Sequence, residues 1–131
     1  NDRVQLAEAE RLFQQRQTRQ LMMQGVTFAD PSRVDIRGNL RCGTDCFIDV
    51  NTVFIGDVVL SDEVSIGPGA VIEDSSLGAG VIVKPHTVVE GARVEAQARR
   101  VLDGRVAAVV LEVVPDGDVV RARGRRARRP G

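Results

Sequence analysis

Ten consecutive units of five or six residues decide the fold of this chain. From residue 42 they read CGTDCF (42–47), IDVNTV (48–53), FIGDVV (54–59), LSDEVS (60–65), IGPGAV (66–71), IEDSS (72–76), LGAGVI (77–82), VKPHTV (83–88), VEGAR (89–93) and VEAQAR (94–99). Every unit except the first begins with a large apolar residue, and the first begins with Cys42. The residue two places before each next unit is small or β-branched. The stretch is therefore an internal repeat, which has to be recognised before any other feature.

The double pattern has a physical explanation in a three-sided prism. Each unit supplies one short strand and one corner, and both its leading residue and its small residue point inward. Three units close one coil, which buries its inner face only against neighbouring coils. Leu60, Leu77 and Val94 are 17 residues apart, as three units with one deletion require. An antiparallel sheet would need strict alternation and hairpin turns such as Asn-Gly, and it explains fewer positions. The sequence predicts a mainly β protein, a left-handed parallel β-helix.

A long α-helix is predicted to precede the repeats, over residues 2–24. This stretch contains no Gly or Pro and is rich in good helix formers. Asp2 is the expected N-cap and Gly25 the expected stop. Leu6, Ala9 and Phe13 form one apolar stripe at helical spacing. Residues 14–20 are polar all round, which favours an exposed helix that bridges two parts of a protein.

The repeat pattern is predicted to end after residue 99. Continuing the register would place Arg100, Val106, Glu112 and Asp118 inside the prism, where unpaired charges are costly. A shift by one residue places Arg99, Arg105 and Arg123 at the small inward positions. We expect two or three strands in 101–120 around a turn at 115–117, and disorder over 121–131. The expected division is a connecting helix (1–24), a segment leading into the solenoid (25–41), β-helix coils (42–99) and a divergent tail (100–131).

Composition and charge limit the class of protein. Four Phe and no Trp or Tyr among 131 residues favour thin aliphatic layers over a bulky aromatic core. No stretch reaches the roughly 20 apolar residues that cross a bilayer, and the polar start shows no signal peptide. We therefore expect a cytoplasmic protein without a membrane partner. Because the first residue is not Met, we expect the sequence to start inside a longer protein. Residues 1–98 carry a net charge of −5 and residues 99–131 one of +5, which indicates a boundary.

Three stretches of the chain carry a family resemblance. Residues 1–7 (NDRVQLA) resemble the N-[ND]-R-x-Q-L signature that closes the uridyltransferase domain of the bifunctional N-acetylglucosamine-1-phosphate uridyltransferase/glucosamine-1-phosphate acetyltransferase family. Residues 21–37 (LMMQGVTFADPSRVDIR) resemble that family's connection between long helix and β-helix, and residues 64–91 resemble its first coils. The resemblance covers about residues 1–98. Many acyltransferases share the hexapeptide repeat alone. The specific signal is the combination of the signature at 1–7, the helix and the connecting segment with the repeat.

The resemblance implies a parent transferase that makes UDP-N-acetylglucosamine for peptidoglycan and lipopolysaccharide synthesis. The parent transfers acetyl from acetyl-CoA to glucosamine-1-phosphate, then uridylyl from UTP with Mg²⁺, and it assembles as a homotrimer. The family's Gly-rich nucleotide loop and first metal-binding aspartate have no counterpart here. Residues 99–104 (RRVLDG) depart from the family's next coil. The family's later coils, which carry the catalytic histidine, have no counterpart here either. UTP, acetyl-CoA and sugar phosphate would therefore bind to missing regions. We expect this fragment to be inactive, with no catalytic or cofactor-binding residue, so its own status as an enzyme stays open.

Asn1 is the one candidate metal ligand. It matches the first asparagine of the family signature, which resembles a Mg²⁺ ligand in the parent, and a carbonyl oxygen suits this hard cation. The remaining oxygen donors would have to come from the missing domain and its substrate. For the isolated chain we expect no cofactor.

The other candidate residues are predicted to have structural roles. His86, the only histidine, and Lys84 are expected on the solenoid surface. Cys42 and Cys46 have C-x₃-C spacing, but too few further ligands exist for zinc, so we expect them to fill the core. The glycines of 66–70 and 77–80 do not match a phosphate loop and are expected at corners. The basic tail, 121–131, lacks aromatic residues for base stacking, and we expect no nucleic-acid partner.

Two other functions are compatible with the residues. One is a structural or trimerising β-helix module that self-associates through its faces or its open end. The other is a small stand-alone hexapeptide acyltransferase, which would need His86 as its catalyst. A frameshift, a fusion and an assembly error all remain open as origins of the divergent ending.

Overall fold

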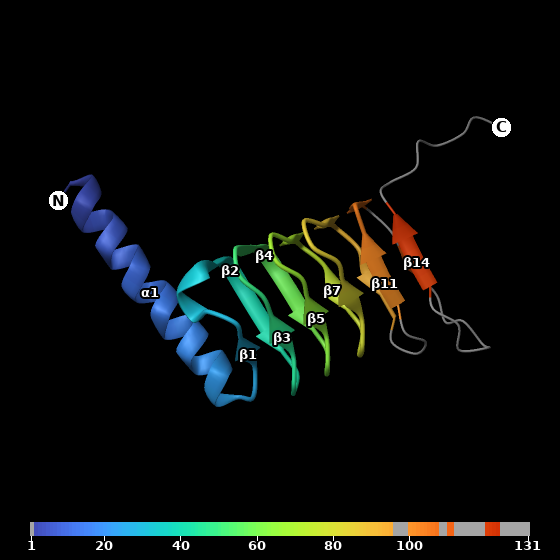
Figure 1. Cartoon of the computed structure of the whole chain (residues 1–131). Coiled ribbons are helices and arrows are strands. Elements are labelled where there is room, and N and C mark those ends of the chain that lie inside the picture. Colours follow the sequence, from blue (N-terminus) through green and yellow to red (C-terminus); the bar gives the residue numbers. More distant parts are fainter. Residues whose placement is uncertain (1, 96–99, 108–109, 112–119, 124–131) are drawn as a thin grey trace.

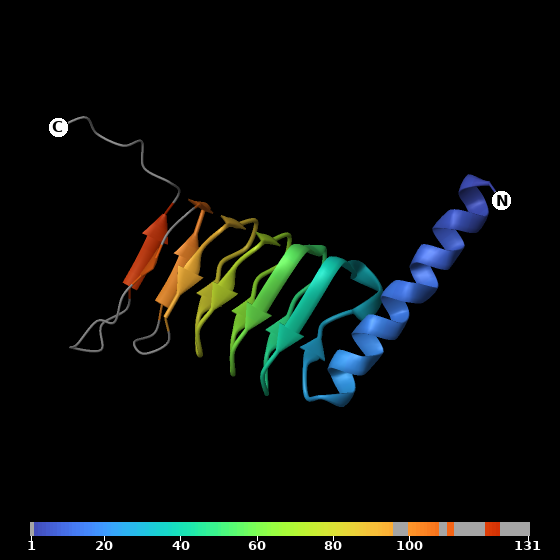
Figure 2. The ribbon, with the colours of Figure 1, turned by 180° about the vertical axis from the view of Figure 1, so that it is seen from behind.

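A helix followed by a three-sided parallel solenoid makes up the chain (Figures 1 and 2). This computed structural model describes residues 2–95, 100–107, 110–111 and 120–123. The predicted mainly β, left-handed parallel β-helix with an N-terminal helix is confirmed. The elements are α1 (Arg3–Met23), β1 (Thr27–Phe28), the 3₁₀ helix η1 (Pro31–Arg33), β2 (Val34–Cys42), β3 (Phe47–Ile48), β4 (Thr52–Leu60), β5 (Ser65–Ile66), β6 (Val71–Glu73), β7 (Ser76–Leu77), β8 (Ile82–Val83), β9 (Val88–Glu90), β10 (Arg93–Val94), β11 (Arg100–Asp103), β12 (Arg105–Ala107), β13 (Val110–Leu111) and β14 (Val120–Arg123).

The strands stack into three parallel faces. Face 1 runs β1-β3-β5-β8-β11-β14. The nine-residue strands β2 and β4 pair along their whole length and contribute to the other two faces. Face 2 continues from the first half of β4 through β6, β9 and β12. Face 3 continues from the end of β4 through β7, β10 and β13.

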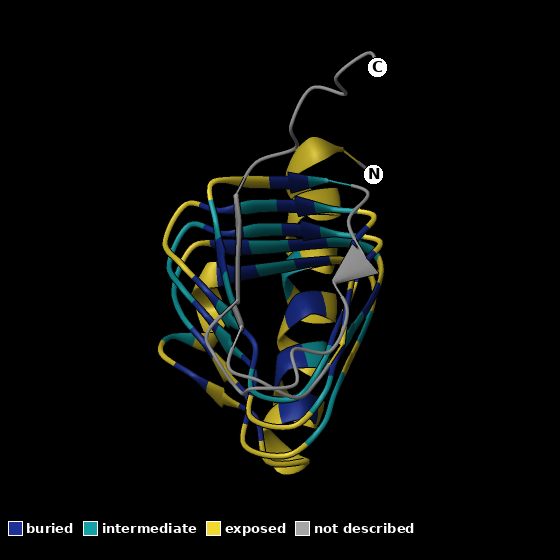
Figure 3. Cartoon of the chain, turned by 90° about the vertical axis from the view of Figure 1, so that its right-hand side faces the viewer, coloured by how far each residue is buried: buried dark blue, intermediate teal, exposed yellow. Residues whose placement is uncertain are grey.

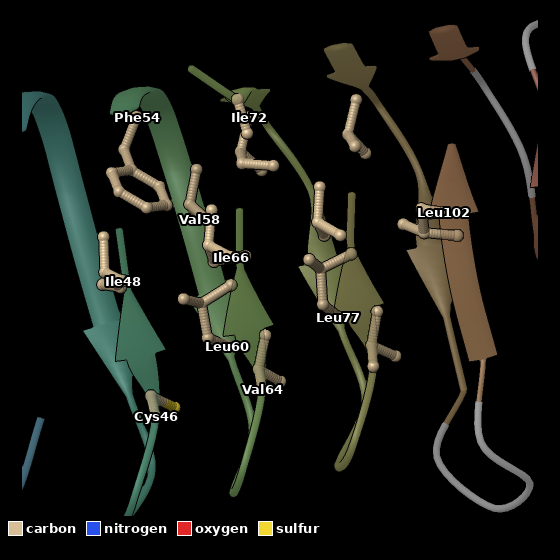
Figure 4. Packing of buried hydrophobic residues seen from close by; sticks show 14 of the residues in the cluster. Cys46, Ile48, Phe54, Val58, Leu60, Val64, Ile66, Ile72, Leu77 and Leu102 are labelled. Atoms are coloured by element: carbon tan, nitrogen blue, oxygen red, sulfur yellow. The ribbon is translucent and has the colours of Figure 1, made fainter. Parts of the chain in front are cut away.

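The core is a set of stacked apolar columns inside the prism (Figure 4). On face 1, Ile48 pairs in register with Ile66, which pairs with Val83. All nine predicted apolar leaders from Ile48 to Val94 are at most 2% exposed, and Cys42 is half-buried. The predicted small inward residues are buried as well: Cys46, Thr52, Val58, Val64, Ala70, Ser75, Val81, Thr87 and Ala92. Each fully buried Leu, Ile or Val side chain contributes roughly 1.5–3 kcal/mol. The repeat register read from the sequence is therefore confirmed through residue 94.

Helix α1 begins and ends where the sequence predicts. The Asp2 side chain accepts a hydrogen bond from the Gln5 backbone N–H at 2.9 Å, and the Gln5 side chain accepts one from the Asp2 N–H at 3.2 Å. This reciprocal arrangement is a capping box. Gly25 follows the helix with a φ of +106°, a conformation that suits glycine at a helix end. The expected N-cap and stop are both confirmed.

The predicted exposure of the helix is wrong for its middle. Gln14 and Thr18 are each only 2% exposed, and with Leu21 they form the buried face of α1. The apolar stripe proposed from the sequence lies outside this buried face, and Leu6 is 69% and Phe13 50% exposed. The reason is that the helix lies across the end of the solenoid, where the edge of a strand offers backbone groups rather than an apolar surface (Figures 1 and 3).

Of the two registers extended past residue 98, the first correctly places Val106 inside the prism, but neither places Leu102 there. Leu102 pairs with Val83 and Val106 with Val89, and both side chains are fully buried. Leu102 follows the leader Val94 by eight residues instead of six, and Val106 follows Leu102 by four instead of six. A local gain of two residues is therefore followed by a loss of two. Fixed spacing of five or six could not represent this compensation, which keeps charged residues out of the core.

Strands β11, β12 and β13 lie in the stretch where two or three strands were expected, and a further strand, β14, follows them. Strand β14 pairs in parallel with β11 from Val120 to Arg123, whereas disorder was expected from residue 121. Backbone pairing does not require apolar side chains, so an arginine-rich stretch can take part in it. The expected turn at 115–117 and residues 124–131 lie outside the described part of the chain.

Candidate functional site at the helix–solenoid junction

The junction between α1 and β2 is built around the side chain of Gln14. Its Nε2 donates a hydrogen bond to the Ile36 carbonyl oxygen at 2.9 Å, and its Oε1 accepts one from the Ile36 N–H at 2.8 Å. Both bonds are buried. The carboxamide therefore occupies the place of a peptide group from a neighbouring strand, and it satisfies backbone groups that would be costly to bury unpaired.

Two neighbours of Gln14 on the helix extend this arrangement along the strand edge. The Arg11 guanidinium donates to the Ser32 carbonyl oxygen at 2.9 Å, and the Gln17 Nε2 donates to that of Gly38 at 3.5 Å. Arg11 also lies 3.8 Å from the Asp35 carboxylate, but this ion pair is exposed and contributes little. The side chains at positions 11, 14 and 17, spaced by three on the helix, thus bind the outer edge of the first coil.

A cavity of about 390 Å³ lies beside these contacts, between α1 and β2. Carboxamides from Gln17, Gln20, Gln24 and Asn39 line it, and Leu21, Ile36, Leu40, Arg41 and Cys42 complete its wall. The Gln17 Oε1 is buried and has no hydrogen-bond partner among the described residues. The junction is therefore bonded firmly at Gln14 and more loosely at Gln17.

The sequence did not reveal the role of Gln14. Its signal was present, because Gln14, Thr18 and Leu21 recur at i, i+4 and i+7 and so share one helix face. Hydropathy hides this face, since two of the three residues are polar. A search for long carboxamides at helical spacing beside a solenoid would have found it.

The cysteines fill the corner of the first coil, as predicted. Cys46 is 1% exposed, and its thiol donates a hydrogen bond to the Ser61 carbonyl oxygen at 3.0 Å. A hydrogen bond with Cys46, and then burial, raise the pKa of the Cys42 thiol above its ordinary value. Cys42 therefore stays protonated at neutral pH, whereas the same hydrogen bond lowers the pKa of the Cys46 thiol to about 7. The burial of Cys46 and the half-burial of Cys42 indicate that the pair packs in the core.

His86 and Lys84 are exposed on the solenoid surface, as the sequence predicted. His86 adopts a positive φ of 59° at a corner, and its imidazole lies over Gly69 of the coil before it. A Cβ atom added to Gly69, whose φ is +74°, would collide with the imidazole Nδ1. The expected corner position of Gly69 is confirmed, and the Gly–His contact explains the residue pair structurally.

The Mg²⁺ ligand predicted at Asn1 lies outside the described residues. Its neighbour Asp2 uses its carboxylate to cap α1. Within residues 2–95 and the shorter described stretches, no three His, Cys, Asp or Glu side chains are grouped so that they could hold a metal ion. These residues do not fit Mg²⁺ by themselves, and Asn1 remains a prediction.

None of the described helices has the length and the hydropathy needed to cross a membrane.

Curated relatives match most of this chain. No protein-family model matches it. It is 52% identical over 99 residues to the bifunctional protein GlmU of Acidithiobacillus ferrooxidans. The matching stretch makes up 76% of this chain and 22% of the relative. The GlmU proteins of Burkholderia vietnamiensis (51% over 96 residues, 73% and 21% covered) and Stutzerimonas stutzeri (54% over 92 residues, 70% and 20% covered) are similar to a comparable extent. The chain thus spans about a fifth of the length of these relatives. Over 70–76% of its own length, the chain is therefore similar to one segment of the bifunctional GlmU proteins.

Proposed function

We propose that this chain supplies the connecting helix and the first β-helix coils of a bifunctional GlmU-type enzyme. In that role it joins a nucleotidyltransferase domain to an acetyltransferase solenoid, in a cytoplasmic protein that makes UDP-N-acetylglucosamine. The observation that carries the proposal is the identity of 51–54% to GlmU proteins from three genera over 92 to 99 residues. The junction at Gln14 supports a connecting role, since buried hydrogen bonds join the helix to the solenoid.

The chemistry of the parent would be carried by residues outside this chain. UTP, acetyl-CoA and the sugar phosphate would bind to the missing regions, and the parent would form a homotrimer. When bound, Mg²⁺ would neutralise charge on the nucleotide phosphates, and Asn1 would supply one oxygen ligand. The contribution of the described residues is mechanical: the capped helix and the close-packed columns hold the two domains at a fixed separation.

A chimera tests this proposal. The matching stretch of the Acidithiobacillus ferrooxidans protein would be replaced by residues 2–95 of this chain, and uridylyl transfer, acetyl transfer and molecular mass would be measured. We expect the chimera to retain both activities and the mass of its parent, while the isolated 131-residue chain has neither activity. A folded chimera without either activity, or uridylyl transfer by the isolated chain, would refute the proposal.

A further inference from the structure

Two thiols meet across the first corner of the solenoid. Cys42 ends β2 and Cys46 directly precedes β3, and the three residues between them, 43–45, form the corner. Both cysteines occupy inward positions of the repeat, and a hydrogen bond joins their thiols. Cys46 lies among the stacked residues of the core (Figure 4). To form a disulfide, the two sulfur atoms need only move from this contact to a separation of roughly 2 Å.

The corner between the two cysteines is held in shape by bonds that do not involve their sulfur atoms. The Gly43 N–H donates to the Leu60 carbonyl oxygen at 2.8 Å, and the Thr44 N–H donates to the Asp62 carboxylate at 2.9 Å. Both acceptors belong to the next coil of the solenoid. Because these bonds fix the backbone that carries both cysteines, a covalent bond between the thiols requires no refolding of the corner.

The two thiols differ in how far a small molecule can reach them. Cys42 is half-buried and lines two cavities, the one of about 390 Å³ at the junction with α1 and another of about 540 Å³ beside the end of β4. Cys46 is only 1% exposed, and its thiol faces the Ser61 carbonyl oxygen. A small oxidant can therefore reach Cys42 directly, whereas Cys46 is shielded by the core.

The hydrogen bond between the thiols also allows a thiolate to form where an oxidant arrives. Donation from Cys42 lowers the pKa of the Cys46 thiol to about 7, so the pair loses one proton near neutral pH. Transfer of the remaining shared proton from Cys42 to Cys46 moves the negative charge to the accessible sulfur. A reachable thiolate beside a second thiol is typical of cysteines that are oxidised reversibly.

We propose that Cys42 and Cys46 are a peroxide-oxidisable pair that closes a reversible disulfide across this corner. The Cys42 thiolate attacks one oxygen of hydrogen peroxide, so that a sulfur–oxygen bond forms, the oxygen–oxygen bond breaks, and the departing hydroxide takes up a proton to become water. The Cys46 sulfur then attacks the resulting sulfenic acid, and its proton leaves with the hydroxyl group as a second water. The two thiols lose two electrons in total, and the peroxide gains them.

The test is treatment of the full 131-residue chain with hydrogen peroxide, followed by alkylation of free thiols and mass spectrometry of tryptic peptides without reduction. The chain has only two cysteines, and both lie in the peptide that begins after Arg41, which contains no Met. A disulfide within one chain makes this peptide lighter by two hydrogen atoms, whereas a disulfide between copies joins two such peptides. The matched variants are Cys42→Ser and Cys46→Ser.

We expect the peptide of the unaltered chain to lose two hydrogen atoms, and dithiothreitol to restore both thiols. Cys46→Ser should stop at the sulfenic or sulfinic acid of Cys42. Cys42→Ser should react roughly tenfold more slowly than Cys46→Ser, because its remaining thiol is buried.

Four results would overturn the proposal: thiols that do not react, oxygen added to Cys42 while the Cys46 thiol stays free in the unaltered chain, disulfides only between copies, or equal reaction rates of the two variants. Should circular dichroism show that a serine variant does not fold, the product of the unaltered chain and its reversal by dithiothreitol decide the question.

Discussion

At the residue scale, two side chains have structural roles that the periodic pattern of apolar residues does not predict. Gln14 replaces a peptide group at the edge of β2, and His86 covers the glycine of the preceding coil. The role of each residue is set by the backbone around it rather than by hydropathy. The first satisfies buried polar groups, and the second occupies space that only glycine leaves free.

Replacing Gln14 by Met should lower the free energy of unfolding by about 1–3 kcal/mol, because the Ile36 N–H and C=O would stay buried without partners. Urea denaturation at low protein concentration measures this change. Gln15→Met should remain within about 0.5 kcal/mol of the unaltered chain, as expected for an exposed position. Equal effects of the two substitutions would show that the carboxamide does not bind the strand edge.

Gly69 and Gly80 allow backbone strain to be separated from steric contact. Their φ values are +74° and +77°. Gly69 lies beneath the His86 imidazole, whereas a Cβ atom at Gly80 would meet no atom within 4 Å from the described residues beyond its chain neighbours. Gly80→Ala should cost about 1–2 kcal/mol from strain alone. Gly69→Ala should cost more, and the excess should disappear in a His86→Ala background. Thermal or urea unfolding of the four variants measures this, and an excess that persists without the imidazole would contradict the contact.

At the element scale, the continuation of the solenoid past residue 99 depends on a few inward residues. Leu102→Ala should cost about 2–4 kcal/mol, because Leu102 is fully buried against the column of Val83. Val101→Ala, at a half-buried neighbouring position of β11, should cost less than about 1 kcal/mol. Equilibrium unfolding distinguishes the two. If both changes were neutral, the coil would end where the repeat spacing suggests.

The sequence predicted the elements well wherever one constraint dominated. From residue 42 to 94, the narrow prism demands large and small apolar residues at fixed places, so reading their spacing gave the register. The ends of α1 followed from Asp2 and Gly25, whose capping chemistry is local. The buried face of the helix and the coil at Leu102 were missed for different reasons. The buried face of the helix is polar because it has to bind backbone groups of a strand edge. The coil at Leu102 follows a unit that is two residues longer than expected, and the next unit is two residues shorter, so reading fixed spacings missed it.

At the scale of the whole molecule, the chain is a solenoid with a helical cap at its N-terminal end. The candidate site offered less to prediction than the fold did. Asn1 rests on family resemblance alone, and the junction became visible only when β2 and α1 were placed together. The cap and the stacked coils form one mechanical unit. Hydrogen bonds from the backbone N–H groups of Ile36 at one end, and of Lys84 and Val88 at the other, hold it together.

Hydrogen exchange of three amides by NMR tests this account most directly. The Ile36 N–H donates to Gln14 at the capped end, while those of Lys84 and Val88 donate to the carbonyl oxygens of Leu102 and Gly104 at 2.9 and 2.7 Å. The account predicts that all three exchange as slowly as the Val71 amide in the middle of the solenoid, which donates to Thr87. Fast exchange at Ile36 would contradict the helical cap, and fast exchange at Lys84 and Val88 would contradict the coil beyond residue 99.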